Sequence, residues 1–128
     1  MIVLDTHAWI WWAAESPRLS TRARATIDEA ESLGVSAISC WEVAMLVERG
    51  RLKLDRETLT FVRQALAMPR VELLPVTPEA AVAAARLPPD FQGDPADRMI
   101  AATALEGGAS VVSKDSRLRR LRELKVIW

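Results

Sequence analysis

The sequence has little of several residue types that often reveal a protein's chemistry. Among its 128 residues there is one cysteine, one histidine and no tyrosine. Because Cys40 stands alone, the chain forms neither an internal disulfide nor a zinc site built on cysteines, which fits a reducing cytoplasm. The single histidine, His7, is a weak candidate for a general base, and we expect it to pack against or cap the first helix.

Long hydrophobic runs and net charge are also lacking. No uninterrupted apolar run approaches the roughly 20 residues that span a bilayer, and no basic stretch precedes the apolar residues at the start of the chain. We therefore expect a cytoplasmic protein without a leader or membrane anchor. The 17 basic residues balance the 17 acidic ones, so overall charge neither favours nor excludes nucleic-acid binding, which would require a local basic patch.

What the sequence does contain is enough apolar residues, 50% of the chain, for one core. No repeat, low-complexity tract or linker divides it, so we expect one domain over residues 1–128. Apolar strand segments alternate with helical ones, which favours an α/β fold with a parallel sheet. We expect strands at residues 2–4, 35–38, 71–74, 110–113 and 126–127. We expect helices at residues 8–14, 21–32, 39–50, 56–68, from 78 onward, 96–106 and 117–121.

Helix boundaries are marked by residues with known end preferences. Ser20, Asp55 and Thr77 are suitable N-cap residues, and Pro78 suits the first position of a helix. Gly34 is expected just past the end of the helix at 21–32.

Acidic residues lie where the expected strands end. Asp5 follows the first strand directly, Glu42 lies one turn past the second, and Asp115 follows the strand at 110–113. Asp94 and Asp97 open the helix that precedes that last strand. Ligands of open parallel sheets bind outside the carboxyl ends of the strands. We therefore expect these acids to gather at one edge of the sheet.

Gathered carboxylates repel each other and raise the pKa of at least one member. A divalent cation removes that conflict, and Mg²⁺ prefers oxygen ligands. Such an ion activates water and neutralises charge on a phosphoryl oxygen. The pattern therefore indicates hydrolysis of phosphodiester bonds without a covalent enzyme intermediate.

Each acid also has a purely structural interpretation. Ser39 and Glu42 have the spacing of a capping box, in which Glu42 serves only its own helix. Asp94 is a suitable N-cap, and Asp97 is favoured by the helix dipole. The two acids that follow strands directly fit a helix cap and a turn. The positions alone leave both interpretations open.

Four segments carry a resemblance to a known family. They are Leu4–Ala8 with Trp11–Trp12, Ser39–Val43 with Gly50–Leu52, Asp94–Ala102, and Val112–Asp115 with Leu118. In this order and spacing they resemble the motifs of VapC-like PIN domains, the toxins of VapBC-type toxin–antitoxin pairs. The resemblance extends over essentially the whole chain.

The resemblance implies a Mg²⁺- or Mn²⁺-dependent endoribonuclease on a compact parallel α/β sheet flanked by helices, cleaving RNA with metal-activated water. It also implies the toxin role of a type II pair, a cognate antitoxin protein as partner, and a homodimer. The catalytic and metal-binding acids carried over from the family are Asp5, Glu42, Asp97 and Asp115. Asp94 is a further metal ligand or a helix cap.

The resemblance also assigns supporting roles. Thr6 and Ser113 occupy hydroxyl positions that orient acids or waters. Apart from the resemblance, Arg98 stands next to Asp97, so we expect it to pair with an acid and hold it in place. The sequence departs from the family at Gln92, where relatives often have His, and at Ser113, where they often have Thr.

Four basic residues near the fourth acid are candidates for contacting the RNA backbone, with an ordinary solvated face as the alternative. They are Lys114, Arg117, Arg119 and Arg120.

Other Mg²⁺-dependent acidic sites fit less well. A haloacid-dehalogenase-like phosphatase needs a second Asp two residues after the first, where this chain has His7. A receiver domain needs paired acids after its first strand, where Asp5 stands alone. The remaining rival is an interaction module that keeps the PIN scaffold without activity, and the intact set of acids argues against it.

Overall fold

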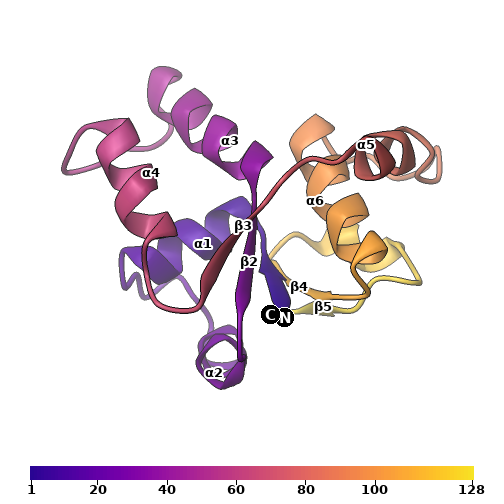
Figure 1. Ribbon diagram of the computed structural model, residues 1–128, viewed down its shortest axis with the longest axis horizontal. Coiled ribbons are helices and arrows are strands. Elements are labelled where there is room, and N and C mark those ends of the chain that lie inside the picture. The colour runs from indigo at the N-terminus through magenta and orange to yellow at the C-terminus, as the bar shows by residue number, and fades with distance from the viewer.

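A five-stranded parallel sheet forms the centre of the computed structural model, which describes residues 1–128 (Figure 1). Its strands are β1 (Ile2–Leu4), β2 (Leu33–Ser36), β3 (Val71–Leu74), β4 (Ser110–Val112) and β5 (Val126–Ile127), in the order β3-β2-β1-β4-β5. The middle strand β1 places Leu4 opposite Val35 of β2 and Val112 of β4. The carboxyl ends of these three strands therefore meet at one edge of the sheet.

Helices cover both faces of this sheet. They are α1 (Thr6–Ala13), α2 (Thr21–Glu29), α3 (Ala37–Glu48), α4 (Thr58–Leu66), α5 (Pro78–Ala85), α6 (Pro95–Glu106) and a short 3₁₀ helix, η1 (Ser116–Arg120). Successive strand residues point to opposite faces. Leu4 therefore joins a core with α1 to α4, whereas Val3 joins a second core with α6 and η1. In Figure 1, α1 and α4 lie to the left of the sheet, α2 below it and α3 above β2, whereas α5 and α6 lie to the right.

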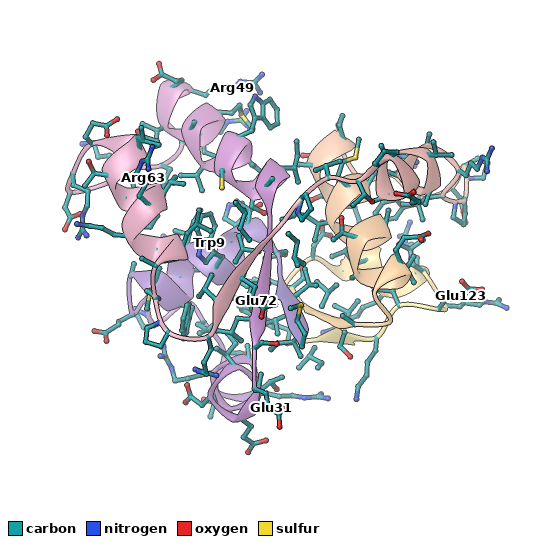
Figure 2. All side chains as sticks on the ribbon, in the orientation of Figure 1. Trp9, Glu31, Arg49, Arg63, Glu72 and Glu123 are labelled. Carbon is teal, nitrogen blue, oxygen red and sulfur yellow. The ribbon has the colours of Figure 1, made fainter.

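Burial follows the apolar pattern of the sequence. Trp9 of α1 is fully buried among the first core cluster. Figure 2 shows it inside the molecule, whereas Glu31, Arg49 and Glu123 extend from the periphery. No helix is long and apolar enough to cross a membrane.

The predicted α/β class, the parallel sheet and most elements are confirmed. Ser20, Thr77 and Asp94 cap α2, α5 and α6 as expected, and Pro78 opens α5. The cap of α4 was predicted wrongly, because Glu57 rather than Asp55 accepts the amide hydrogens of Leu59 and Thr60.

The prediction for Gly34 is wrong, and the second strand begins and ends two residues earlier than expected. Gly34 lies inside β2 rather than past the end of α2, which stops at Glu29. A Cβ atom at Gly34 would lie 2.6 Å from Cδ1 of Leu74, so a larger residue there would require the Leu74 side chain to shift. With β2 ending at Ser36, that serine caps α3 by accepting from the Ile38 amide.

The capping-box interpretation of Glu42 is wrong, because Ser36 rather than Ser39 caps α3. Ser39 lies within α3 rather than at its N-cap, and its hydroxyl accepts a hydrogen bond from Thr6 at 3.0 Å. Glu42 is therefore a buried acid in the second turn of α3 with no capping role.

Candidate metal centre and active site

Asp5 sits at the carboxyl end of the central strand and is held from both of its oxygens. Its Oδ1 accepts the Ala8 amide at 2.8 Å, which makes it the N-cap of α1. Its Oδ2 accepts a hydrogen bond from the Ser113 hydroxyl just past β4. Asp5 is thus a helix cap and also a fixed carboxylate at the edge of the sheet, so the two interpretations of this acid are compatible.

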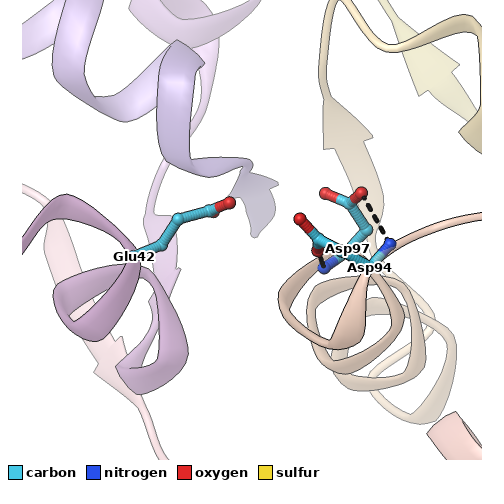
Figure 3. A group of neighbouring side chains, drawn as sticks. All are labelled: Glu42, Asp94 and Asp97. Atoms are coloured by element: carbon cyan, nitrogen blue, oxygen red, sulfur yellow. Dashed lines mark hydrogen bonds between the residues drawn. The ribbon is translucent and has the colours of Figure 1, made fainter. Parts of the chain in front are cut away.

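Glu42 reaches the same edge from α3. It is only 7% exposed, although it is an acid, and its helix neighbours Val43 and Leu46 belong to the apolar core. Figure 3 shows its side chain extending from α3 toward the start of α6, where Asp94 and Asp97 lie. An acid in such surroundings needs a partner, because an ion without one is costly to bury.

Asp94 and Asp97 begin α6 with a reciprocal pair of hydrogen bonds. The Asp97 amide donates to Oδ1 of Asp94 at 2.8 Å, and the Asp94 amide donates to Oδ2 of Asp97 at 3.2 Å (Figure 3). This capping box leaves lone pairs free on both carboxylates. Carboxylate oxygens of Glu42, Asp94 and Asp97 lie within 4.8 Å of one another. Three hard oxygen donors at this separation can hold a divalent cation.

Asp115 approaches from the other side, where η1 begins. The guanidinium of Arg117 contacts both of its oxygens, with Nη2 2.7 Å from Oδ2 and Nε 3.0 Å from Oδ1. The same Nη2 lies 3.1 Å from Oδ2 of Asp97, and Nη1 donates to the Gln92 carbonyl at 3.1 Å. Arg117 therefore joins the two sides of the site.

The acids differ in protonation because their surroundings differ. Burial, followed by repulsion from Asp94, raises the pKa of Asp97 to about 7. Burial also raises the pKa of Asp5 and of Glu42, against the lowering effects of the Ser113 hydroxyl on Asp5 and the Thr6 hydroxyl on Glu42. These three groups resist ionisation unless a cation compensates.

Asp115 shows the opposite behaviour. Hydrogen bonds from the Arg117 guanidinium lower the pKa of the Asp115 carboxyl, and Asp115 in turn raises the pKa of Arg117. Asp115 therefore stays ionised in the absence of any added cation.

A single cleft of about 420 Å³ contains all of these acids. Its lining consists of Asp5, His7, Trp11, Arg18, Glu42, Asp94, Asp97, Lys114, Asp115 and Arg117. Five carboxylates thus face three permanent cations. The sequence patterns that placed acids at strand ends correctly predicted their convergence on one cleft.

Comparison with known proteins identifies the fold and the family. The sequence model of the PIN domain matches residues 2–124. The chain is 44% identical to ribonuclease VapC22 of Mycobacterium tuberculosis, an alignment that covers 99% of this chain and 98% of the relative. This chain is a PIN domain. The resemblance drawn from its motifs is therefore confirmed.

Solved structures share the fold of this PIN domain at lower identity. VapBC2 from Rickettsia felis, bound to a DNA fragment from its promoter, superposes with a TM-score of 0.72 at 16% identity, covering 98% of this chain and 97% of that chain. DNA-bound VapBC from Salmonella typhimurium gives a TM-score of 0.72 at 19% identity, with the same coverage of both chains.

One supporting role predicted for this PIN domain is wrong. Arg98 pairs with no acid. Its Nη1 and Nη2 donate to the carbonyls of Ala84 and Phe91, and its guanidinium carbon lies 5.6 Å from the centre of the Phe91 ring. Arg98 thus ties α6 to the segment that follows α5. The arginine that holds the acids is Arg117, which lies 20 residues from Asp97 along the chain.

The predicted basic residues divide between two places. Lys114 and Arg117 line the acidic cleft. Arg120 lines a separate pocket with Leu87 and Leu121, and Arg119 is exposed outside the acidic cleft. Sequence reasoning missed Arg18 because it follows Pro17 in a loop with no pattern of its own.

Proposed function

We propose that this PIN domain is an endoribonuclease that hydrolyses RNA phosphodiester bonds with Mg²⁺ or Mn²⁺. The observation that carries the proposal is the convergence of Glu42, Asp94 and Asp97 oxygens within 4.8 Å in an open cleft. The 44% identity to a protein named as a ribonuclease gives the substrate class.

The donor set fits a hard divalent cation. All three donors are carboxylates, the ligand type that Mg²⁺ and Mn²⁺ prefer. The pKa of Asp97 is raised to about 7 and that of Glu42 is raised as well, chiefly by burial, so a dication would relieve an electrostatic cost already present. The two charges of one such ion would also balance the excess of carboxylates over cations in the lining.

The residues divide the work of the reaction between them. Glu42, Asp94 and Asp97 would hold the cation, with Asp5 and Asp115 completing its acidic surroundings. When bound, the ion supplies a water nucleophile at neutral pH and neutralises charge on a phosphoryl oxygen. Ser113 and the Ala8 amide fix the carboxylate of Asp5, and Arg117 fixes Asp115. These contacts position acids before substrate arrives, so less reorganisation is needed in the transition state.

We further propose that the chain is the toxin of a type II toxin–antitoxin pair and that it binds a cognate antitoxin as a homodimer. The support is its identity to a protein named VapC22, together with structural neighbours that are described as VapBC complexes. An inactive interaction module is the less favoured alternative, because every acid implied by the family is present in the cleft.

The test is cleavage of a labelled pool of structured RNA by protein purified under conditions that strip any bound antitoxin. Wild type is compared in Mg²⁺, Mn²⁺ and EDTA with Asp5→Asn and with Asp28→Asn, an exposed acid of α2 outside the cleft. Cleavage that requires metal, is lost in Asp5→Asn and is kept in Asp28→Asn supports the proposal.

Other outcomes contradict it in distinguishable ways. Cleavage that persists in both EDTA and Asp5→Asn indicates a contaminating nuclease. Folded protein that neither cleaves RNA nor binds Mn²⁺ overturns the enzyme proposal in favour of the interaction module.

A further inference from the structure

The lining of the acidic cleft includes four side chains that the proposed metal chemistry does not use. His7 and Trp11 come from α1, Arg18 from the loop after it, and Lys114 from the loop after β4. Trp11 is the one apolar residue of the lining. We propose that these residues form a nucleotide subsite, in which Trp11 stacks on a base of single-stranded RNA and Arg18 and Lys114 bind a neighbouring phosphate.

Trp11 is held in place by aromatic neighbours. Its ring centre lies 5.5 Å from that of His7, with the planes at 52°, and 5.7 Å from that of Trp128, with the planes at 58°. Tilted contacts of this kind are favourable for aromatic rings. Trp11 is half-buried and also packs on the first core cluster, yet part of it reaches the cleft. A ring fixed before binding loses little conformational freedom when a base stacks on it.

Arg18 and Lys114 are the cations of the lining that are free to meet a phosphate. Arg117 is already committed to Asp115, Asp97 and the Gln92 carbonyl. Arg18 and Lys114 take part in no ion pair, and both are exposed. The Lys114 ammonium lies 5.9 Å from the centre of the Trp11 ring. A cation–π contact at an exposed site is weak, so an incoming base can displace Lys114 toward the phosphate.

The substrate form follows from this combination of side chains. Proteins bind single-stranded nucleic acid by stacking its unpaired bases on aromatic rings beside cations that track the backbone. A duplex offers no free base face to Trp11. Because Trp11 and Arg18 lie at and just after α1, we expect the single strand to cross the α1 side of the cleft. This path runs away from Arg119 and Arg120, which lie outside the cleft.

The subsite rests on the proposed function for its substrate class, and a binding measurement tests it separately from cleavage. We would measure the affinity of a fluorescein-labelled ten-nucleotide single-stranded RNA by anisotropy in Ca²⁺, which takes carboxylate oxygens as Mg²⁺ does. A gel run alongside reports whether the RNA remains intact.

Two pairs of variants isolate the subsite. Trp11→Leu is matched by Trp12→Leu, since Trp12 is the next residue of α1, is half-buried on the same core and does not line the cleft. Arg18→Ala is matched by Arg22→Ala, an exposed residue of α2 outside the cleft. Trp11→Phe keeps an aromatic face if Trp11→Leu fails to fold.

Trp11→Leu is expected to weaken binding roughly 10-fold or more, as loss of a stacked base does elsewhere, and Trp11→Phe by less. Arg18→Ala should reduce the slope of log affinity against log salt by about 0.7, one phosphate contact on a single strand. Trp12→Leu should keep wild-type affinity, and Arg22→Ala should keep the wild-type salt slope. Equal affinities for Trp11→Leu and Trp12→Leu, or an unchanged salt slope in Arg18→Ala, overturn the subsite even if wild type cleaves RNA. Wild type that shows these binding effects but neither cleaves RNA nor binds Mn²⁺ overturns the proposed reaction instead.

Discussion

The two sides of the acidic cleft keep their carboxylates in opposite electrostatic states. On the side formed by α3 and α6, burial raises the pKa of Glu42 and brings that of Asp97 to about 7. On the side formed by β4 and η1, Arg117 lowers the pKa of Asp115. Both sides line the same cavity. The difference between them is that Arg117 contacts both oxygens of Asp115 but reaches Asp97 through one nitrogen only.

This contrast suggests a division of roles. The Glu42, Asp94 and Asp97 group has one contact with Arg117 for three carboxylates, so it is the side that gains most from an added dication. Asp115 is already paired with Arg117, so it gains less from such an ion. Arg117 links the two, because the same Nη2 lies 2.7 Å from Asp115 and 3.1 Å from Asp97.

Removing a carboxylate from the side formed by α3 and α6 should have the largest effect. Asp97→Asn is expected to lower RNA cleavage about 100-fold or more, since even partners of metal ligands cost about 10- to 100-fold in affinity or activity. Its melting temperature in EDTA should not fall, because the lost carboxylate was electrostatically unfavourable. Initial cleavage rates and thermal melting in EDTA measure the two effects. Glu106→Gln, exposed at the far end of the same helix, is the control, and wild-type cleavage by Asp97→Asn would refute the role.

Removing the chain's own cation should make the two sides alike. In Arg117→Met, Asp115 and Asp97 lose a positive neighbour, so the pKa of both should rise. We expect cleavage to fall about 10-fold and the pH at half-maximal Mn²⁺ binding to move upward, because protons then compete better with the metal. Arg117→Lys keeps the positive charge but not the planar guanidinium. Its cleavage rate and its pH midpoint should therefore lie between those of wild type and Arg117→Met. An unchanged pH midpoint in Arg117→Met would show that Arg117 does not tune the site.

The pH dependence of stability should show whether the acids with a raised pKa or the acid with a lowered pKa contributes more to it. Between pH 3.8, the ordinary pKa of Asp, and about 7, folded Asp97 retains a proton that the unfolded chain has lost. Stability in EDTA should therefore decline as pH rises through this window, with Asp5 and Glu42 acting in the same direction. Asp115, with its lowered pKa, favours the opposite slope only at more acidic pH.

Calorimetric melting across this pH window, with and without Mg²⁺, tests the expectation. Mg²⁺ should flatten the decline by binding the ionised acids of the folded state. A melting temperature that does not fall between pH 4 and 7 in EDTA would contradict the raised pKa of Asp97.

The smallest effect is expected from the hydroxyl between the two sides. Ser113 donates to Asp5, and its oxygen accepts the Asp115 amide at 3.0 Å. Ser113→Ala should lower the free energy of unfolding by about 1 kcal/mol and slow cleavage a few-fold. Urea unfolding and initial rates measure these changes. Ser113→Thr retains the hydroxyl, so equal losses in both variants would assign the effect to packing instead.

The sequence predicted the sheet and the convergence of acids because both depend on local patterns. Strand ends, N-cap residues and the Asp94–Asp97 spacing can be predicted from a few neighbouring residues. The arginine that holds the acids could not be predicted in this way. Arg98 stands next to Asp97 but points to backbone carbonyls, whereas Arg117 reaches Asp97 only through the fold.

Glu42 illustrates how a local rule can mislead. Ser39 and Glu42 have capping-box spacing, yet the strand ends early enough for Ser36 to cap α3. Gly34 lies inside β2, paired with Glu72 of β3, rather than after α2. That pairing is with a strand almost 40 residues further along the chain, so it cannot be predicted from the residues next to Gly34.

The central position of β1 has a consequence for when the protein becomes active. The contact between Asp5 and Ser113 spans 108 residues, and β1 pairs with β4 near the far end of the chain. Synthesis releases the chain from its N-terminus, so Asp5 emerges early while Asp97, Asp115 and Arg117 emerge last. A nascent chain therefore lacks the cleft until nearly all of it has left the ribosome.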